Sequence, residues 1–190
     1  MFDWSYCICS PIDNRSICIL FDGKYVNYSH VRQIICYHLV RRRKRMGFFI
    51  KHFNELTTRE LYEILKTRQE IFIIEQDCPY MDIDDLDLDA IHVFSMNEEG
   101  RVTSCLRVFM RDEETKTAQI GRVVTLTHGE GLGGELLHEG VNVALNHYKA
   151  EKIYLEAQTY AKGLYEKQGF RQVSDEFLLD GIPHVKMLLE

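Results

Sequence analysis

The hydrophobic positions between residues 48 and 72 change from a strand-like to a helix-like pattern. Residues 48–53 form a short, mostly apolar run that predicts a first strand. Thr57 and Glu60 then have the spacing of a capping box, in which each side chain satisfies a free backbone N–H at the start of a helix. We expect the charged residues between the apolar positions of this helix to face water. Its apolar face should hold the residues at helical spacing, which are Leu61, Ile64, Leu65, Arg68 and Phe72.

Alternating segments follow this helix along the chain. Residues 90–96 and 102–110 predict two antiparallel strands joined through residues 98–100, and residues 119–126 predict a third strand of the same set. Residues 128–134 then form a glycine-rich turn that runs directly into a second helix. The expected apolar face of that helix is Leu137, Val141, Ala144, Leu145 and Tyr148.

The C-terminal part of the chain completes the fold. Residues 153–156 predict a strand, and residues 161–167 predict a short helix that ends at Gly169 as its C-terminal cap. Residues 171–174 and 184–189 predict the last two strands, linked through residues 180–183. With no internal repeats, the pattern predicts one α+β domain with a mixed, mostly antiparallel central sheet flanked by helices.

Composition agrees with a folded domain and separates the N-terminal segment from the rest. Of the 190 residues, 45% are hydrophobic, yet no apolar run approaches the roughly 18 residues that span a bilayer, which predicts a soluble protein. Residues 1–45 hold 8 basic and 3 acidic residues, so the other 145 hold 15 and 26, a net charge of −11. An acidic body disfavours nucleic acid and anionic membranes as partners and favours cationic ligands.

Residues 1–45 lack sustained periodicity and end in the basic run 41–45, directly before Met46. Such a run can bind nucleic acid or act as a targeting signal. We prefer the hypothesis that translation begins at Met46, because Arg and Lys can be encoded by purine-only codons, and a purine-rich stretch before a Met resembles a ribosome-binding site. Residues 1–45 would then be a non-domain extension of upstream read-through, and residues 46–190 the domain. Mass spectrometry of the native N-terminus tests this hypothesis.

Cysteines divide at the same place, since only Cys78 and Cys105 of the six follow Met46. Two cysteines far apart in sequence provide no disulfide scaffold, and an opening that contains Asp3 does not resemble a secretory signal. These features predict a cytoplasmic protein.

The glycine-rich turn predicts a site for an anion. Free backbone N–H groups and the helix dipole favour phosphate at a helix N-terminus, and glycines let its oxygens reach the amides. A tight turn that binds nothing is the alternative. A P-loop is excluded because Glu135 and Leu136 stand where Lys and Ser or Thr are needed. Gly129, Gly131 and Gly134 also satisfy a dinucleotide fingerprint, but too late in the chain for a doubly wound fold.

A third pattern fits the turn better. His128, Gly131 and Gly133 match the signature Gln/Arg-x-x-Gly-x-Gly/Ala, with His in place of Gln or Arg, and residues 164–170 follow as a second motif, Leu-Tyr-Glu-Lys-Gln-Gly-Phe. Together these motifs resemble the GNAT superfamily of N-acetyltransferases. Residues 68–80, 82–92, 121–124, 156–158 and 180–184 are similar to its ElaA-like branch, so the resemblance covers residues 47–190 and none of 1–45.

The resemblance implies acetyl-CoA as the donor and a small-molecule or peptide amine of unspecified identity as the acceptor. It implies a pantetheine arm along the backbone of Val123, Val124 and Thr125, with the pyrophosphate on the amides of the turn. The remaining implied contacts to the coenzyme are His128, Gly129, Gly131, Leu132, Gly133, Gly134 and Gln158. A homodimer is compatible with the sequence.

Catalysis would need a base and an acid. A lysine-like amine has a pKa of about 10.4, so its neutral form costs roughly 4–5 kcal/mol at pH 7. Glu75 and Glu156 are the candidate bases, with solvated surface carboxylates as the alternative. Tyr165 is the candidate acid that protonates the leaving thiolate, with simple packing under the helix as the alternative.

The acidic stretch 82–89 does not predict a calcium loop, because no register supplies both the central Gly and the terminal Glu of an EF-hand. A solvated loop is the expected structure, with steering of a cationic acceptor as a second role. His92, His128 and His184 lack metal-ligand spacing, so we expect no metal site. Two other functions stay open: a non-catalytic acyl-CoA-binding module and a dinucleotide-binding protein.

Overall fold

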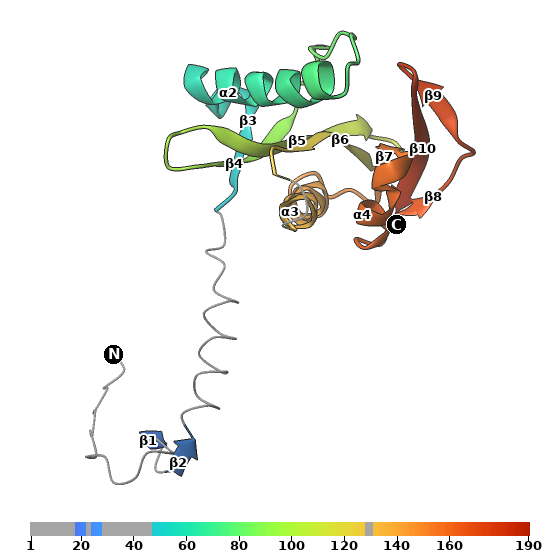
Figure 1. Ribbon diagram of the computed structural model, residues 1–190. Helices are drawn as coiled ribbons and strands as arrows, with labels where there is room; N and C mark the ends of the chain where they lie inside the picture. The colour runs from blue at the N-terminus through green and yellow to red at the C-terminus, as the bar shows by residue number, and fades with distance from the viewer. Residues whose placement is uncertain (1–17, 22–23, 28–46, 128–130) are drawn as a thin grey trace. The chain divides into compact units, whose positions relative to one another are not determined.

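The computed structural model describes residues 18–21, 24–27, 47–127 and 131–190 (Figure 1). The chain divides into two compact units, residues 1–46 and 47–190. In the first unit, β1 (Cys18–Phe21) pairs antiparallel with β2 (Lys24–Asn27). Because these strands have only four residues each, they leave no sustained alternation of apolar and polar residues in the sequence. The basic run 41–45 and Met46 lie outside the described residues, so the translation start at Met46 stays a prediction.

The second unit is built on one sheet. Within residues 47–127 and 131–190 this sheet has eight strands in the order β3-β4-β5-β6-β7-β10-β8, with β9 paired to β10. The strands are β3 (Phe49–His52), β4 (Ile91–Met96), β5 (Val102–Asp112), β6 (Thr117–Thr125), β7 (Lys152–Gln158), β8 (Arg171–Gln172), β9 (Phe177–Leu179) and β10 (Ile182–Leu189). Neighbouring strands are antiparallel except β6 and β7, which are parallel. This topology confirms the predicted mixed, mostly antiparallel sheet.

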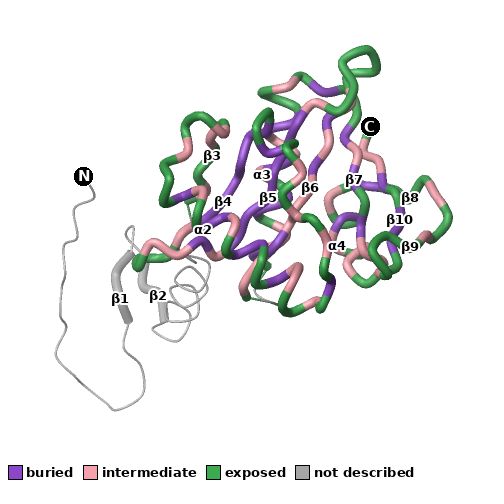
Figure 2. Tube along the Cα trace, turned by 90° about the horizontal axis from the view of Figure 1, so that it is seen from above, coloured by how far each residue is buried: buried purple, intermediate pink, exposed green. Residues whose placement is uncertain are grey.

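Helices cover both faces of the sheet (Figure 1). One face carries α2 (Thr58–Arg68), which continues as a π-helix, η2 (Gln69–Glu75); the other carries α3 (Leu132–Asn146) and α4 (Lys162–Glu166). Two short 3-10 turns, η1 (Phe53–Glu55) and η3 (Thr159–Ala161), connect elements. Each face has its own apolar core, and β4 and β5 between the two cores are mostly buried (Figure 2).

Helix α2 begins as its sequence predicts. The Glu60 amide donates to the Thr57 hydroxyl over 3.2 Å, and the Thr57 amide donates to the Glu60 carboxylate over 2.8 Å, which confirms the capping box. The prediction that the charged residues between its apolar positions face water is wrong for Glu63, whose side chain is 2% exposed. Arg101 lies 3.0 Å from that carboxylate and compensates its burial.

Helix α3 buries most of the predicted apolar face: Leu137 and Ala144 are buried, and Val141 and Tyr148 pack against the core. Leu145 is 46% exposed, and its place in the expected apolar face is wrong. Leu136, Gly140 and Val143 are buried instead. A Cβ added to Gly140 would lie 2.8 Å from the Leu106 side chain, so glycine lets α3 approach β5 closely. The helix therefore turns Gly140 toward β5. The hydrophobic pattern of the sequence does not predict this orientation.

The C-terminal hairpin adds a strand that the sequence pattern did not predict. Asp180 and Gly181 have φ angles of +50° and +82°, and they connect β9 to β10 as a two-residue turn. Asp-Gly is a preferred pair in two-residue hairpin turns, so this pair in the sequence could have indicated the hairpin. Gly169 has a φ of +93° and its amide donates to the Glu166 carbonyl, which confirms the predicted cap of α4.

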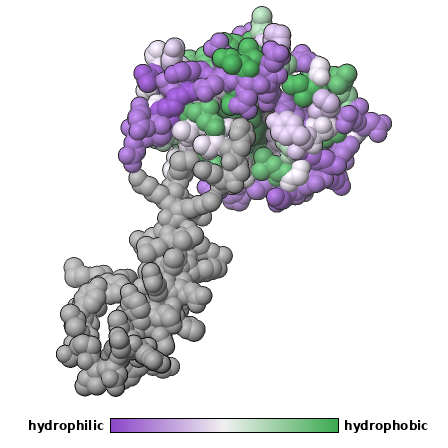
Figure 3. All heavy atoms as spheres, viewed as in Figure 1, coloured by the Kyte–Doolittle hydropathy of each residue, from purple (hydrophilic) through white to green (hydrophobic). Residues whose placement is uncertain are grey.

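The surface of the second unit mixes side-chain types. Hydrophilic side chains cover much of the face seen in Figure 3, with hydrophobic groups between them. The exposed apolar side chains include Tyr62, Ile74 and Met81. Among the described residues, no helix is long and apolar enough to cross a membrane.

Candidate active site

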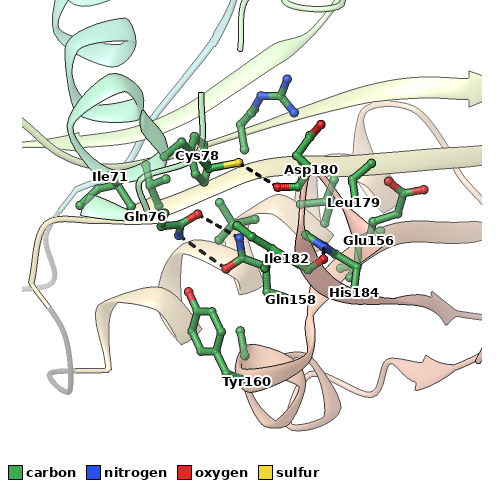
Figure 4. A pocket seen from close by; sticks show the side chains of 18 of the residues that line it. Ile71, Gln76, Cys78, Glu156, Gln158, Tyr160, Leu179, Asp180, Ile182 and His184 are labelled. Carbon is green, nitrogen blue, oxygen red and sulfur yellow. Dashed lines mark hydrogen bonds between the residues drawn. The ribbon is translucent and has the colours of Figure 1, made fainter. Parts of the chain in front are cut away.

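A cavity opens where the two parallel strands separate. β6 and β7 pair only from Thr117 to Gln119 on β6, opposite Lys152 to Tyr154 on β7. Beyond this point a cavity of about 300 Å³ lies between them. Its walls come from η2, β6, β7, η3, α4 and the β9–β10 hairpin (Figure 4). Elements far apart in the sequence therefore converge on one space.

The β6 wall offers backbone groups to the cavity. Val124 is 3% exposed because its side chain packs into the core beneath α2, whereas Val123 packs against the core on the α3 side. On the β5 side, Val124 and Thr125 pair with Cys105 and Ser104. On the β7 side, β6 has no strand partner here among the described residues. This strand edge can pair with an extended ligand.

A bulge shapes the same strand. The register between β5 and β6 shifts after Cys105, and Arg122 on the bulged strand has a φ of +55°, in the left-handed region. The Arg122 side chain lines the cavity and also contacts the acidic loop. The bulge thus turns β6 away from a regular path just before Val123, Val124 and Thr125.

The first turn of α3 lies beside the cavity. Gly131 has a φ of +83°, and its carbonyl accepts from the amides of Gly134 and Glu135 over 3.1 and 3.3 Å. The amides of Leu132 and Gly133 have no acceptor within the described part of the chain. Because the Leu132 side chain is 7% exposed, only its backbone can contribute. The predicted contacts His128 and Gly129 lie outside the described residues.

Helix α4 packs against that first turn. A Cβ at Gly133 would lie 3.5 Å from the Leu164 side chain, and the Gln168 amide donates to the Gly134 carbonyl over 3.3 Å. Tyr165, next to Leu164, lines the cavity and is 8% exposed. Burial, and less strongly the nearby Tyr160, raise the pKa of the Tyr165 hydroxyl. The phenol therefore stays protonated at neutral pH, as a proton donor must.

Two amides bridge the cavity from opposite walls. The side-chain Nε2 of Gln158, at the end of β7, donates to Oε1 of the Gln76 side chain over 3.0 Å (Figure 4). Nε2 of Gln76 lies 3.5 Å from Oε1 of Gln158. Tyr160 projects toward this pair. Tyr160 and Glu75 both line the cavity, and burial together with the charge of Glu75 raises the pKa of the Tyr160 hydroxyl.

The two candidate bases differ in their surroundings. Glu75 and Glu156 both line the cavity and both are exposed. Glu156 accepts a hydrogen bond from the Tyr154 hydroxyl over 2.7 Å and stands opposite Lys186 in the β7–β10 ladder. The structure thus brings Glu75, Glu156 and Tyr165 to one cavity, as the sequence predicted.

The hairpin brings residues to this cavity to which the sequence assigned no catalytic role. The Cys78 thiol donates to the Asp180 carbonyl over 3.4 Å, which ties the loop after η2 to the hairpin turn (Figure 4). His184 lines the cavity, and its Nδ1 lies 2.8 Å from the Ile182 carbonyl oxygen. Residues 180–184 are among the segments of the family resemblance, and that was the only available signal.

The expectation of a solvated acidic loop is wrong for Asp82, Asp84 and Asp87, which pair with arginines, whereas Asp85 and Asp89 are exposed. The three paired aspartates contact arginines of α2, β5 and β6 and form an arginine–aspartate cluster that consists of Arg68, Arg107, Arg122, Asp82, Asp84 and Asp87. Arg68, 1% exposed, donates to Asp82 and Asp87 over 2.8 Å each. Arg107 donates to both oxygens of Asp84 over 2.6 Å. The arginine charges compensate the cost of removing these carboxylates from water. The periodicity of the sequence does not reveal such pairing between separate elements.

Ionisation in the cluster follows from this pairing. Burial alone would raise the pKa of Asp87, but hydrogen bonds and charge from Arg68 and Arg107 outweigh it and lower that pKa. The pKa of Asp84 is lowered in the same way by Arg107 and Arg122 against the effect of burial. Among the described residues, no three His, Cys, Asp or Glu side chains group as metal ligands.

Comparisons with known proteins agree on one family. The sequence profile of the acetyltransferase (GNAT) domain matches residues 66–190. A UPF0039 protein of Schizosaccharomyces pombe is 36% identical over 148 residues, covering 76% of this chain and 97% of that protein. Protein ElaA of Escherichia coli is 33% identical over 143 residues, covering 73% and 93%.

Solved structures extend the similarity to the fold. The crystal structure of Escherichia coli ElaA has a TM-score of 0.71 at 30% identity and covers 76% of this chain and 99% of that one. An acyl-CoA N-acyltransferase from Pseudomonas aeruginosa has a TM-score of 0.69 at 34% identity, covering 75% and 98%.

Proposed function

The chain belongs to the GNAT acetyltransferase family, in its ElaA-like branch, and from this premise we propose that it transfers an acetyl group from acetyl-CoA to a primary amine. Acyl-CoA-dependent acetyl transfer is the activity of the family. The choice of acetyl-CoA as donor and of an amine nitrogen as acceptor is the proposed part.

The cavity fits an acyl-CoA donor. The free edge of β6 at Val123, Val124 and Thr125 suits the amide-containing pantetheine arm, which would lie beside it like an added strand. The amides of Leu132 and Gly133 at the start of a 15-residue helix suit the pyrophosphate. When bound, the donor supplies an activated acetyl group as a thioester.

One observation carries the proposal: the strand edge, the open helix N-terminus and a buried phenol border the same cavity. Leu164 contacts Gly133, and the next residue is Tyr165. A ligand that lay along β6 and reached the first turn of α3 would pass Tyr165, which lines the same cavity. Inert packing does not require these three features together.

Two proton transfers must accompany the reaction. The acceptor attacks as a neutral amine, whose formation from a lysine-like ammonium costs roughly 4–5 kcal/mol at pH 7. Glu75 and Glu156 line the cavity and are the carboxylates that could take this proton, directly or through water. Tyr165 donates its phenolic proton to the departing sulfur, and such assistance typically accelerates a reaction by about 10²–10⁴.

Ligand binding separates this proposal from the alternatives. The comparisons support neither a non-catalytic acyl-CoA-binding module nor a dinucleotide-binding protein. Acetyl-CoA and CoA should raise the melting temperature of the protein, whereas NADH should leave it unchanged. Release of free thiol during a screen of primary amines would then distinguish an enzyme from a binding module.

Replacing Tyr165 tests the proposed acid. Tyr165→Phe should lower kcat by about 10²–10⁴ because the thiolate loses its proton donor, while acetyl-CoA still raises the melting temperature as in the wild type. Tyr62→Phe is the matched control, since Tyr62 is 62% exposed on α2 and does not line the cavity. Unchanged turnover in Tyr165→Phe would remove Tyr165 from the mechanism.

A further inference from the structure

His184 occupies a defined position in the wall of the cavity. It is the direct partner of Gln158 in the antiparallel β7–β10 ladder, and directly opposed residues project to the same face of a sheet. On that face Gln158 reaches across to Gln76 of the η2 wall. His184 is 8% exposed and lines the same cavity (Figure 4).

The backbone determines which nitrogen of His184 carries the proton. Nδ1 lies 2.8 Å from the Ile182 carbonyl oxygen. A carbonyl oxygen can only accept, so Nδ1 must donate, and in the neutral ring Nε2 is left with a lone pair. No described residue hydrogen bonds to Nε2. The ring also lies beside Phe177, with ring centroids 6.2 Å apart, which limits its rotation.

We infer that His184 takes the proton from the acceptor amine through Nε2. This inference rests on the proposed function and selects a third group over the two carboxylates. Imidazole is the side chain whose ordinary pKa lies nearest neutral pH, whereas carboxylic acids are ordinarily ionised far below it and are weaker bases. The surroundings agree: Glu156 already accepts from the Tyr154 hydroxyl, and its position is exposed.

The carboxylates then have a supporting role. Glu75, Glu156 and Asp180 line the cavity with His184, and their negative charge favours the positive charge of an incoming ammonium. The one arginine among the described lining residues, Arg122, has Asp82 2.7 Å and Asp84 3.0 Å from its guanidinium. A cationic acceptor therefore meets negative charge beside the proposed base.

The proton and bond changes balance. His184 Nε2 takes one proton from the ammonium group and leaves a neutral amine. The amine nitrogen forms a bond to the acetyl carbonyl carbon, and the carbon–sulfur bond breaks while Tyr165 gives its proton to sulfur. The second nitrogen proton returns to the Tyr165 phenolate through water, and the imidazolium releases its proton to solvent. The products are one amide, one thiol and one proton.

The test compares three variants in a thiol-release assay with the most active amine from a panel of aliphatic primary amines. His184→Gln should lower kcat by about 10²–10⁴, whereas Glu75→Gln and Glu156→Gln should lower it by less than tenfold. Acetyl-CoA should still raise the melting temperature of His184→Gln. His147→Gln is the matched control, because His147 is exposed at the opposite end of α3 and does not line the cavity.

A weakly basic acceptor distinguishes proton removal from a structural effect. With 2,2,2-trifluoroethylamine, which is already neutral at the assay pH, the ratio of wild-type to His184→Gln rates should shrink toward one. A ratio as large as with a strongly basic amine would overturn the inference, as would a loss of activity in Glu156→Gln that matches the loss in His184→Gln.

The native protein offers an independent measurement. Nitrogen-15 NMR of the neutral ring should show Nδ1 protonated and Nε2 unprotonated for His184, and a protonated Nε2 would overturn the inference without any variant. A wild type that binds acetyl-CoA but releases no thiol with any amine would instead refute the proposed function, and the role of His184 with it. Wild-type turnover with an unaffected His184→Gln would refute the inference alone.

Discussion

The arginine–aspartate cluster and the cavity share Arg122, but they use charged and polar side chains differently. In the cluster, each arginine lies within 3.0 Å of an aspartate oxygen, and each aspartate contacts an arginine. In the cavity, the Nε2 of His184 and the hydroxyl of Tyr165 have no hydrogen-bond partner among the described residues. The cluster pairs its charges within the protein, although Asp87 Oδ2, Arg107 Nε and Arg122 Nε make no hydrogen bond among the described residues. The cavity instead keeps polar groups available for a ligand.

This difference separates structural from chemical roles. A buried ion is stable only where an opposite charge compensates the lost hydration, so the cluster holds the acidic loop, α2, β5 and the bulge of β6 together. The cavity keeps polar groups at the edge of the core without such compensation. We therefore expect cluster substitutions to lower stability and cavity substitutions to lower turnover.

The largest expected effect on stability comes from breaking the cluster at its most buried cation. Arg68→Met removes the partner of Asp82 and Asp87 and leaves their charges incompletely compensated in the core, so the free energy of unfolding should fall by about 3–5 kcal/mol. Urea denaturation measures this loss. Arg59→Met is the control, because the Arg59 side chain is 67% exposed beside Glu63 and its loss should cost about 0–1 kcal/mol. Equal losses in the two variants would contradict the structural role of the cluster.

Acid should destabilise the protein through the aspartates of the cluster. Arginine partners lower the pKa values of Asp84 and Asp87 against the effect of burial, so the unfolded chain takes up protons at a higher pH than the folded chain. Their stabilisation is complete above the ordinary aspartate pKa of about 3.9 and is lost as the pH falls through the lowered folded values. Urea denaturation from pH 6 to pH 2 measures this slope.

The matched variant for the acid prediction is Asp84→Asn. Asn has no carboxylate to protonate, so the variant takes up one proton fewer on unfolding in acid. The pH dependence of its free energy of unfolding should therefore be shallower than that of the wild type. An unchanged slope would show that Asp84 does not contribute to the acid sensitivity.

The smallest expected effect comes from the amide bridge across the cavity. Gln158→Leu leaves the Gln76 amide without this partner and should cost about 0.5–1.5 kcal/mol. Because removal of both partners leaves no unsatisfied amide, Gln76→Leu/Gln158→Leu should cost no more than either single change. Thermal denaturation of the three variants gives the coupling energy. Strictly additive losses would show that the bridge does not act as a pair.

Local patterns account for most of the predicted elements. The capping box at Thr57 and Glu60, the alternation in β4 and β5 and the cap at Gly169 involve neighbours in sequence, so their physical causes can be read there. The predicted burial of Leu145 was wrong, because the rotation of α3 depends on how Gly140 fits against Leu106 of β5. The hairpin strand β9 was not predicted, because three residues are too few to show an alternating pattern.

The site divides in the same way. The glycine turn and the residues around Tyr165 were predicted because their motifs are contiguous, and so were Glu75 and Glu156 as residues of one site. The tautomer of His184, the Gln76–Gln158 bridge and the pairing of the acidic loop depend on groups from separate elements.

The sequence by itself determined the fold class, the order of the elements and the family, because each of these depends on periodicity or on contiguous motifs. Only the tertiary structure decided which charges are compensated and which polar atoms remain open to a ligand. The physical reason is that burial and Coulomb energy depend on distances between residues far apart in the chain, such as Arg68 and Asp87 or Gln76 and Gln158, and these distances exist only after folding.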